Sequence, residues 1–161
     1  MHMDGAALFA AVQEMRESLL GGRIERIAQP SRSDIILVIR AQGKNKRLLL
    51  SADPEAARVY ICSEGKKGPD KPFPFLMLLR KHLLHGWVID IENPGMDRAF
   101  ILRISATNDL GDKVEFSLIC EIMGKHSNII LADGDGEIME AVKRVTPSMS
   151  SLRTVLPGER Y

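Results

Sequence analysis

Short β-type segments, separated by turn residues, run through most of this sequence. Residues 34–40 are rich in isoleucine and valine, and 87–92, 99–105 and 113–120 follow as further strand candidates. The run Asp-Gly-Asp-Gly at 133–136 is a strong turn signal between two hairpin arms. Two helical patterns interrupt about eight short strands. The sequence therefore predicts an α+β domain built on a mostly antiparallel β-sandwich or barrel.

Both helical patterns have an apolar face. Within residues 4–20 apolar side chains recur at helical spacing, and Asp4 is suited to cap the N-terminus. Within residues 75–85 the apolar side chains share one broad face. Arg80 and Lys81 fall outside this face, one on each flank, and we expect them to point to solvent or to a ligand. They form a secondary electrostatic candidate site.

Composition favours one domain in a reducing compartment. The chain has 161 residues, close to the commonest domain size, and its two cysteines imply no disulfide framework. With 22 basic and 21 acidic residues, the net charge of +1 does not by itself indicate nucleic-acid binding. The longest apolar run, 75–79, is too short to span a membrane, and no leader pattern is visible. We expect residues 1–161 to be one cytoplasmic domain, without a membrane partner, excised from a longer protein.

No catalytic or metal site stands out among the chemically active side chains. His82 and His85 lie three apart on a helical pattern, and surface histidines explain this spacing better than metal ligands do. The turn at 133–136 resembles a calcium loop, but its twelfth position is an arginine instead of the required glutamate. His126 and Ser127 are adjacent, so on a strand they would point to opposite faces. We expect a binding protein rather than an enzyme, with no metal and no cofactor.

The polar segment 121–128 is the most unusual feature of the chain. It joins two apolar strands but is too long for a tight hairpin. Gly124 allows an unusual backbone angle, Lys125 brings charge, and three further polar side chains follow. Polar loops held on rigid strands are where binding residues usually lie. A second polar feature is the adjacent acid and base at 97–98, placed where a turn enters a strand.

Residues 121–131 resemble the signature E-x-M-G-(R/K)-x-S-N-I-I-L of the NFACT family, also called fibronectin-binding protein A-like. The match extends over essentially the whole chain, and the combination is specific although each piece alone would be weak. Four other segments agree with the family: Met3-Asp4-Gly5, Phe75 to His82, Gly95-Met96-Asp97-Arg98, and Val155 to Tyr161. The chain thus resembles the N-terminal domain of the family.

The resemblance implies a function in ribosome quality control. Family members of the bacterial RqcH and eukaryotic NEMF type bind large ribosomal subunits that are obstructed by peptidyl-tRNA. There they recruit alanyl-tRNA, and the stalled chain gains a C-terminal alanine tail. The family's older name keeps a second interpretation open, a surface adhesin that binds fibronectin.

The resemblance also implies a fold similar to the N-terminal domain of formamidopyrimidine-DNA glycosylases. A third interpretation, a repair enzyme, would follow from that fold. However, those enzymes use an N-terminal Pro-Glu pair that this chain lacks, so their chemistry is not carried over.

The same resemblance places tRNA binding at two motifs. The paired Asp-Arg of the family and its Glu-x-Met loop have matching positions here. Arg98 is suited to contact tRNA phosphates, with Asp97 either holding its side chain or accepting a hydrogen bond from a ribose or base. Further contacts are expected from 125–128, although Ser127 and Asn128 have the alternative role of ordering the loop. The candidate tRNA-binding residues are Asp97, Arg98, Glu121, Ile122, Met123, Lys125, His126, Ser127 and Asn128.

Overall fold

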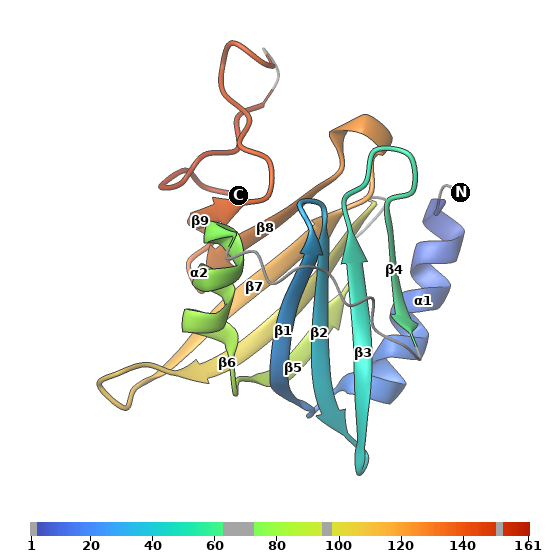
Figure 1. Cartoon of the computed structure of the whole chain (residues 1–161), viewed down its shortest axis with the longest axis vertical. Helices are drawn as coiled ribbons and strands as arrows, with labels where there is room; N and C mark the ends of the chain where they lie inside the picture. The colour runs from blue at the N-terminus through green and yellow to red at the C-terminus, as the bar shows by residue number, and fades with distance from the viewer. Residues whose placement is uncertain (1–2, 63–72, 95–97, 151–152) are drawn as a thin grey trace.

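A computed structural model of the chain describes residues 3–62, 73–94, 98–150 and 153–161. Two α-helices and nine β-strands form an α+β fold, as the sequence predicts (Figure 1). The helices are α1 (Gly5–Leu19) and α2 (Pro74–Leu83), and a short 3-10 turn, η1, spans Gly124–His126. The strands are β1 (Arg23–Ser31), β2 (Asp34–Ala41), β3 (Lys44–Ser51), β4 (Arg58–Cys62), β5 (Trp87–Glu92), β6 (Ala99–Thr107), β7 (Lys113–Glu121), β8 (Asn128–Asp133) and β9 (Ile138–Ala141).

The nine strands form one antiparallel sheet with the order β4-β3-β2-β1-β5-β6-β7-β8-β9. Neighbours along the chain are neighbours in the sheet within β1–β4 and again within β5–β9, so the sheet consists of two meanders. The meanders join where β1 pairs with β5 at Arg23 and Trp87. The sheet is open rather than a closed barrel. Its edge strands are β4, which lies against α1, and β9, which forms backbone hydrogen bonds with residues 153–161. We call residues 153–161 the closing segment.

The two halves repeat one arrangement, a helix followed by an antiparallel meander. Around the β1–β5 joint their backbone hydrogen bonds match in pairs. The Ile24 amide donates to the Gly86 carbonyl at 2.8 Å, and the Val88 amide donates to the Gly22 carbonyl at 2.8 Å. Each helix is followed by a residue with positive φ. After α1 this is Gly21, with φ of 78°, and after α2 it is His85, with φ of 68°. The joint therefore has an approximate two-fold symmetry in which each half supplies the same bonds to the other.

Two arginines extend this symmetry across the joint. Arg16 of α1 donates to the carbonyl of Ile91 in β5, and Arg80 of α2 donates to the carbonyl of Ile27 in β1 at 3.1 and 3.2 Å. Each helix thus packs against the first strand of the other half. Both helices therefore contribute to one main core that the two halves share.

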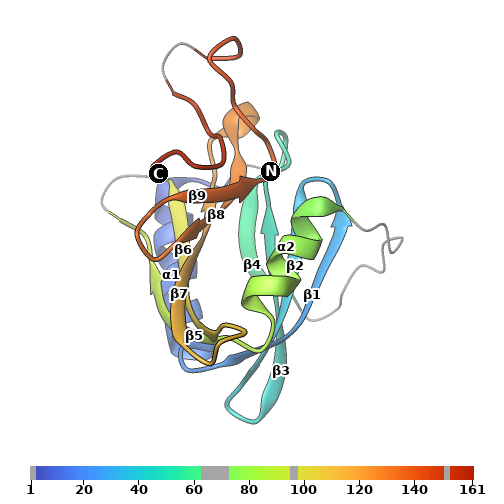
Figure 2. The same ribbon diagram turned by 90° about the vertical axis from the view of Figure 1, so that its left-hand side faces the viewer.

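The sheet curves so that its two halves face each other around the main core (Figure 2). Buried side chains of both helices fill the interior together with the inward faces of the strands. Where the two halves meet, the Cys120 thiol lies 3.9 Å from the Ser51 carbonyl, and the Lys143 ammonium lies 3.2 Å from the Ala52 carbonyl. No described helix is long and apolar enough to cross a membrane.

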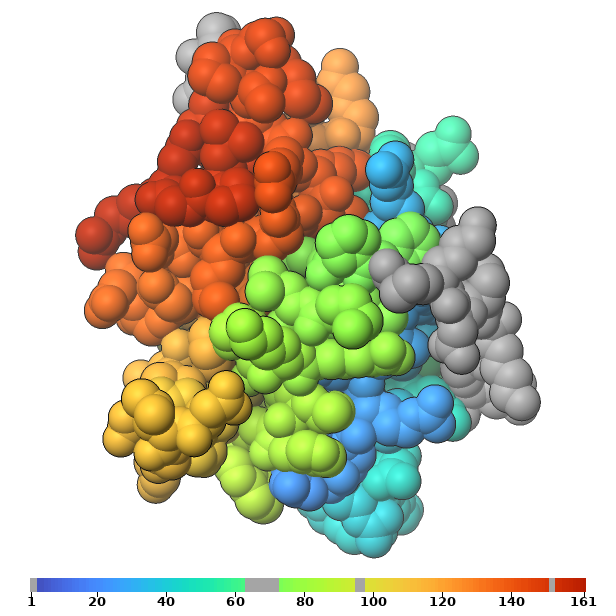
Figure 3. Space-filling model, turned by 60° about the vertical axis from the view of Figure 1, so that its left-hand side comes forward, coloured from blue at the N-terminus to red at the C-terminus, as the bar shows by residue number. Residues whose placement is uncertain are grey.

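A second, smaller core lies on the other face of the C-terminal meander. Val155 from the closing segment packs into it beside residues of β6–β9. The segment is fixed by backbone bonds, including the Ile138 amide to the Glu159 carbonyl at 2.7 Å. In Figure 3 the segment, coloured red, lies over the orange surface of β8 and β9. It therefore shields an apolar surface that the outer face of these strands would otherwise expose.

The predicted elements are confirmed, with small differences at their ends. The sequence predicts that the first strand ends at Ile27, whereas β1 continues to Ser31. Pairing with β2 carries β1 past an irregularity in register between Ala28 and Ser31. The sequence also predicts a polar loop over residues 63–74. Its residues 63–72 and the acidic Asp97 lie outside the described residues, and Pro74 begins α2.

Candidate functional site

The connection between β7 and β8 is a compact turn with its own hydrogen bonds. Gly124 has φ of +57°, a conformation that suits glycine. The Ser127 hydroxyl accepts a hydrogen bond from the Met123 amide at 2.8 Å, and the His126 amide donates to the Met123 carbonyl at 3.0 Å. Ser127 is fully buried. The buried hydroxyl is occupied in closing the turn, so it offers no accessible nucleophile beside His126.

Asn128 fixes the end of the turn to the strand beyond it. Its side-chain amide donates to the Lys143 carbonyl at 2.8 Å, and its side-chain oxygen accepts from the amides of Lys143 and Ile129. Asn128 is 2% exposed, so the side chain has no surface to offer a ligand. Asn128 and Ser127 therefore order the loop, and Ile122 is buried in the main core.

Other members of the same segment face outward. Lys125 and His126 of η1 are exposed, and the Met123 side chain is 40% exposed. Arg98, at the entry to β6, is also exposed, and its carbonyl accepts a hydrogen bond from the Ile122 amide at 2.8 Å. That bond brings the two predicted motifs together, since it joins the start of β6 to the residue after β7.

Glu121 is the buried charge of the site. Its side chain is 6% exposed and accepts a hydrogen bond from the Tyr161 hydroxyl at 2.8 Å. The Arg153 guanidinium lies 2.9 Å from the carboxylate and also 5.3 Å from the Tyr161 ring centre. Burial, and then the neighbouring carboxylate, raise the pKa of the Tyr161 hydroxyl, which stays a donor at neutral pH. The carboxylate therefore binds the closing segment to the end of β7.

Arg153 and Tyr161 were not predicted as site residues. Tyr161 belongs to a closing segment that matches the family, and that match was the available signal. Nothing in the sequence around Arg153 distinguishes it from the other arginines, because its role comes from a contact across the fold.

These residues surround a concave surface of about 330 Å³. The lining residues are Arg98, Ala99, Glu121, Met123, Arg153 and Tyr161. Two arginines and the exposed Met123 therefore line the pocket together with the ion-paired carboxylate of Glu121. Such an arrangement suits an anionic ligand. We call this surface the Arg98–Arg153 pocket.

The predicted secondary site is in a different place. Arg80 is partly occupied by its bond to Ile27, and Lys81 is exposed on α2. Figures 1 and 2 both show α2 away from η1. Lys81 therefore does not join the cluster around the Arg98–Arg153 pocket.

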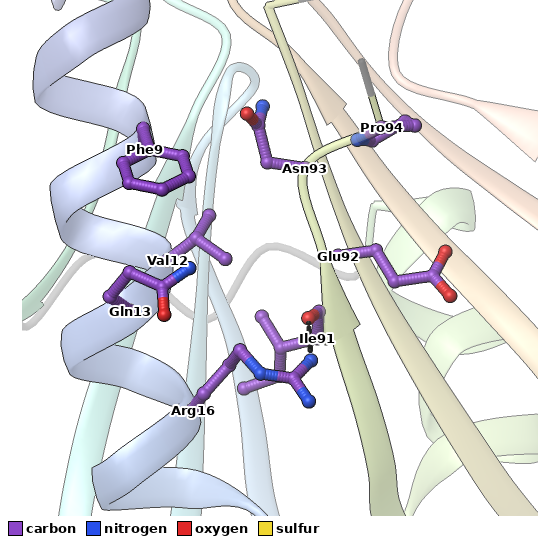
Figure 4. Close-up of a pocket in the computed structure, with 8 residues that line it drawn as sticks. All are labelled: Phe9, Val12, Gln13, Arg16, Ile91, Glu92, Asn93 and Pro94. Atoms are coloured by element: carbon purple, nitrogen blue, oxygen red, sulfur yellow. Dashed lines mark hydrogen bonds between the residues drawn. The ribbon is translucent and has the colours of Figure 1, made fainter.

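A second concavity, about 350 Å³, lies between α1 and the end of β5 (Figure 4). Phe9, which is 59% exposed, forms one wall, and Asn93 and Pro94 form the opposite edge. Its charged groups already have partners. Arg16 pairs with Asp90 at 2.6 Å, and Glu92 pairs with an arginine of β6 at 3.1 Å. This groove is less suited to a charged ligand than the Arg98–Arg153 pocket.

His82 and Asp133, which the sequence raised as possible metal ligands, have other contacts in the fold. The described residues contain no group of three or more histidine, cysteine, aspartate or glutamate side chains arranged for a metal ion. His82 packs its ring 5.2 Å from that of Phe116, and burial lowers the pKa of its imidazole. The Asp133 carboxylate accepts from the amides of Asp135 and Glu137, so it closes the predicted turn.

Known proteins resemble this chain over its whole length. It is 46% identical over 162 residues to Rqc2 homolog RqcH of Bacillus subtilis (strain 168), covering 100% of this chain and 28% of that protein. It is 41% identical to Rqc2 homolog RqcH of Streptococcus pneumoniae serotype 2, covering 29% of that protein. The chain thus spans less than a third of the length of these relatives.

Solved structures share the fold. The N-terminal domain of fibronectin-binding protein PavA from Streptococcus pneumoniae superposes with a TM-score of 0.94 at 41% identity, covering 99% of this chain and 60% of that one. The fibrinogen binding protein from Staphylococcus aureus gives 0.84 at 35% identity, covering 100% and 56%. A family model described as NFACT N-terminal and middle domains matches residues 4–161. The chain therefore belongs to the NFACT family.

Proposed function

We propose that this domain binds tRNA and the large ribosomal subunit as part of a longer ribosome quality-control factor. In that protein it helps to recruit alanyl-tRNA to obstructed large subunits, where the stalled chain gains a C-terminal alanine tail. The proposal follows from relatives that carry the name Rqc2 homolog RqcH at up to 46% identity. It concerns the whole factor, of which this chain corresponds to less than a third.

The observation that carries the proposal is the pairing of the two family motifs at one place. The Ile122–Arg98 hydrogen bond holds the start of β6 against the β7–β8 turn, and the exposed cations Arg98 and Lys125 lie at these two motifs. Folded RNA is bound through phosphates, ribose hydroxyls and shape, so a few placed cations are sufficient on a domain of nearly neutral charge. Asp97 remains a candidate from the family motif.

The test uses the full-length protein and measures alanine tailing on obstructed large subunits. We expect the double variant Asp97→Ala, Arg98→Ala to lose tailing while it keeps the wild-type melting temperature. Arg40→Ala is the matched control, because Arg40 is an exposed strand arginine of the N-terminal meander. Tailing at the wild-type rate by the double variant would remove Asp97 and Arg98 from the site.

A second candidate function is fibronectin binding, which the name of the structural relative from Streptococcus pneumoniae favours. The two functions are separated by direct binding measurements on the same purified protein. Saturable binding to fibronectin together with no measurable binding to tRNA would favour the adhesin. Binding to tRNA that weakens with salt would favour the ribosomal function.

A further inference from the structure

We propose that the Arg98–Arg153 pocket binds a phosphate of the bound RNA, that Arg153 is a direct contact, and that Glu121 acts as a positioning residue. The inference rests on the proposed function, since it names a group of the RNA ligand and the side chains that hold it. It adds Arg153 and Tyr161 to the site and gives Glu121 a different role from RNA contact.

Arg153 has N–H groups that its bond to Glu121 does not use, and that bond orients the guanidinium. The described structure gives the guanidinium two hydrogen-bond distances to Glu121, and both come from the same nitrogen, Nη1. Among the described residues, Tyr161 is the one other side chain that shares a hydrogen bond with the guanidinium. The side chain is 41% exposed. A guanidinium has five N–H groups, so Arg153 can keep its bond to Glu121 and still donate to a phosphate.

Glu121 is placed to orient rather than to contact. Both of its carboxylate oxygens are occupied, Oε1 by Arg153 and Oε2 by Arg153 and the Tyr161 hydroxyl. With a side chain only 6% exposed, it has little surface for RNA. A carboxylate would repel a phosphate, but here its charge is balanced by the paired guanidinium of Arg153. The Tyr161 ring, 5.3 Å from that guanidinium, limits its movement further.

Arg98 supplies the second cation. It is exposed, lines the same pocket, and has no ion pair among the described residues. Because Glu121 and Arg153 neutralise each other, the charge of Arg98 leaves the described pocket lining with a net positive charge. A phosphate oxygen would be met by Arg98 from the start of β6 and by Arg153 from the closing segment. Arg98 directly precedes β6 and Arg153 lies in the closing segment, so the two cations come from distant parts of the sequence.

The experiment measures tRNA binding by the full-length protein at several salt concentrations. Arg153→Gln is expected to weaken binding about tenfold and to reduce the slope of log K against log salt by about one, because one phosphate contact is lost. Arg144→Gln is the matched control. Arg144 is equally a surface arginine with a carboxylate partner, paired with Glu140 at 2.6 Å, but it lies outside the pocket lining. It should leave the slope unchanged.

Two further variants separate contact from positioning. Arg153→Lys keeps the charge, so it should retain the wild-type salt slope while it binds several-fold more weakly. Glu121→Gln removes a negative charge, and simple electrostatics would predict tighter binding. We expect weaker binding instead, because Arg153 and Tyr161 lose their anchor.

The outcomes distinguish the two proposals. If the wild-type protein binds no tRNA, the proposed function and this inference both fail. If the wild type binds tRNA but Arg153→Gln keeps both its slope and its affinity, the phosphate site alone is wrong. Tighter binding by Glu121→Gln, with the melting temperature unchanged, would overturn the positioning role.

Discussion

The N-terminal and C-terminal halves use the same frame but differ in their connections. In the first half the Ala52 amide donates to the Ser33 carbonyl at 2.8 Å, and in the second the Ile122 amide donates to the Arg98 carbonyl at the same distance. Both bonds tie the residue after a third strand to the turn that precedes the second strand. The halves therefore have corresponding loops, which can be compared directly.

The corresponding loops have different chemistry. The β1–β2 turn is only 32–33, whereas the β5–β6 connection spans 93–98 and carries the Asp-Arg motif. The β3–β4 connection, 52–57, contains Asp53 and Glu55, whereas the β7–β8 connection, 122–127, contains Lys125 and a histidine. The family motifs thus lie where the second half departs from the first. The frame therefore supplies rigidity, and the loops that differ between the halves supply residues of the candidate site.

The largest effect on stability is expected from substitutions at Gly22 and Gly86, which test the frame that the two halves share. A Cβ at Gly22 would lie 2.6 Å from a methyl of Ile39, and one at Gly86 would lie 2.7 Å from a methyl of Ile104. Alanine at either position should lower the free energy of unfolding by about 3 kcal/mol, because both sites are already closely packed. Chemical denaturation measures this, with Gly5→Ala as a control where a Cβ meets nothing within 4 Å. Tolerance at one glycine alone would break the symmetry between the halves.

The next largest effect on stability is expected at the first residue of β8, Asn128, compared with the first residue of β4, Arg58. Asn128→Ala removes three hydrogen bonds and leaves half-buried backbone groups of Lys143 without these partners, so it should cost about 2 kcal/mol. Its counterpart Arg58 is half-buried and bonds to the Ala56 carbonyl at 2.6 Å. Arg58→Ala should cost about 0.5 kcal/mol or less. Equal losses would show that both halves depend equally on this position.

The smallest effect concerns pH and the two arginines that cross the joint. Burial acts to raise the pKa of the Asp90 carboxyl, but hydrogen bonds from Arg16 and the Ile91 amide outweigh it and hold the pKa below 3.8. Because the folded-state pKa is the lower one, this stabilisation is present above pH 3.8 and disappears as the pH falls through the folded-state pKa. Asp90→Asn should therefore be destabilising at pH 6 and less destabilising at about pH 2.

The other arginine provides the control for that measurement. Arg80 donates to a backbone carbonyl, which does not titrate in this range. The cost of Arg80→Gln should then be the same at both pH values, by denaturation under matched salt. If the destabilisation by Arg80→Gln also decreased at low pH, the acid dependence at Asp90 could not be assigned to its pairing with Arg16.

The sequence by itself determined the class of the fold, most element boundaries and the family. Local rules suffice for these, because strand alternation, helix periodicity and turn residues such as those at 133–136 act over a few neighbouring positions. The family signature at 121–131 is likewise recognised from consecutive residues alone. It also predicted that Ser127 and Asn128 had two alternative roles.

Tertiary structure alone decided which of those side chains are buried and which are exposed. In the fold, Ser127 and Asn128 are buried and form hydrogen bonds that order the loop, whereas Lys125 is exposed. Glu121 forms a hydrogen bond with Arg153 of the closing segment. The tertiary structure also revealed the repeated frame and its open sheet. These features depend on contacts between residues far apart in the chain, where burial and partner geometry set the role of a side chain. No local pattern contains that information.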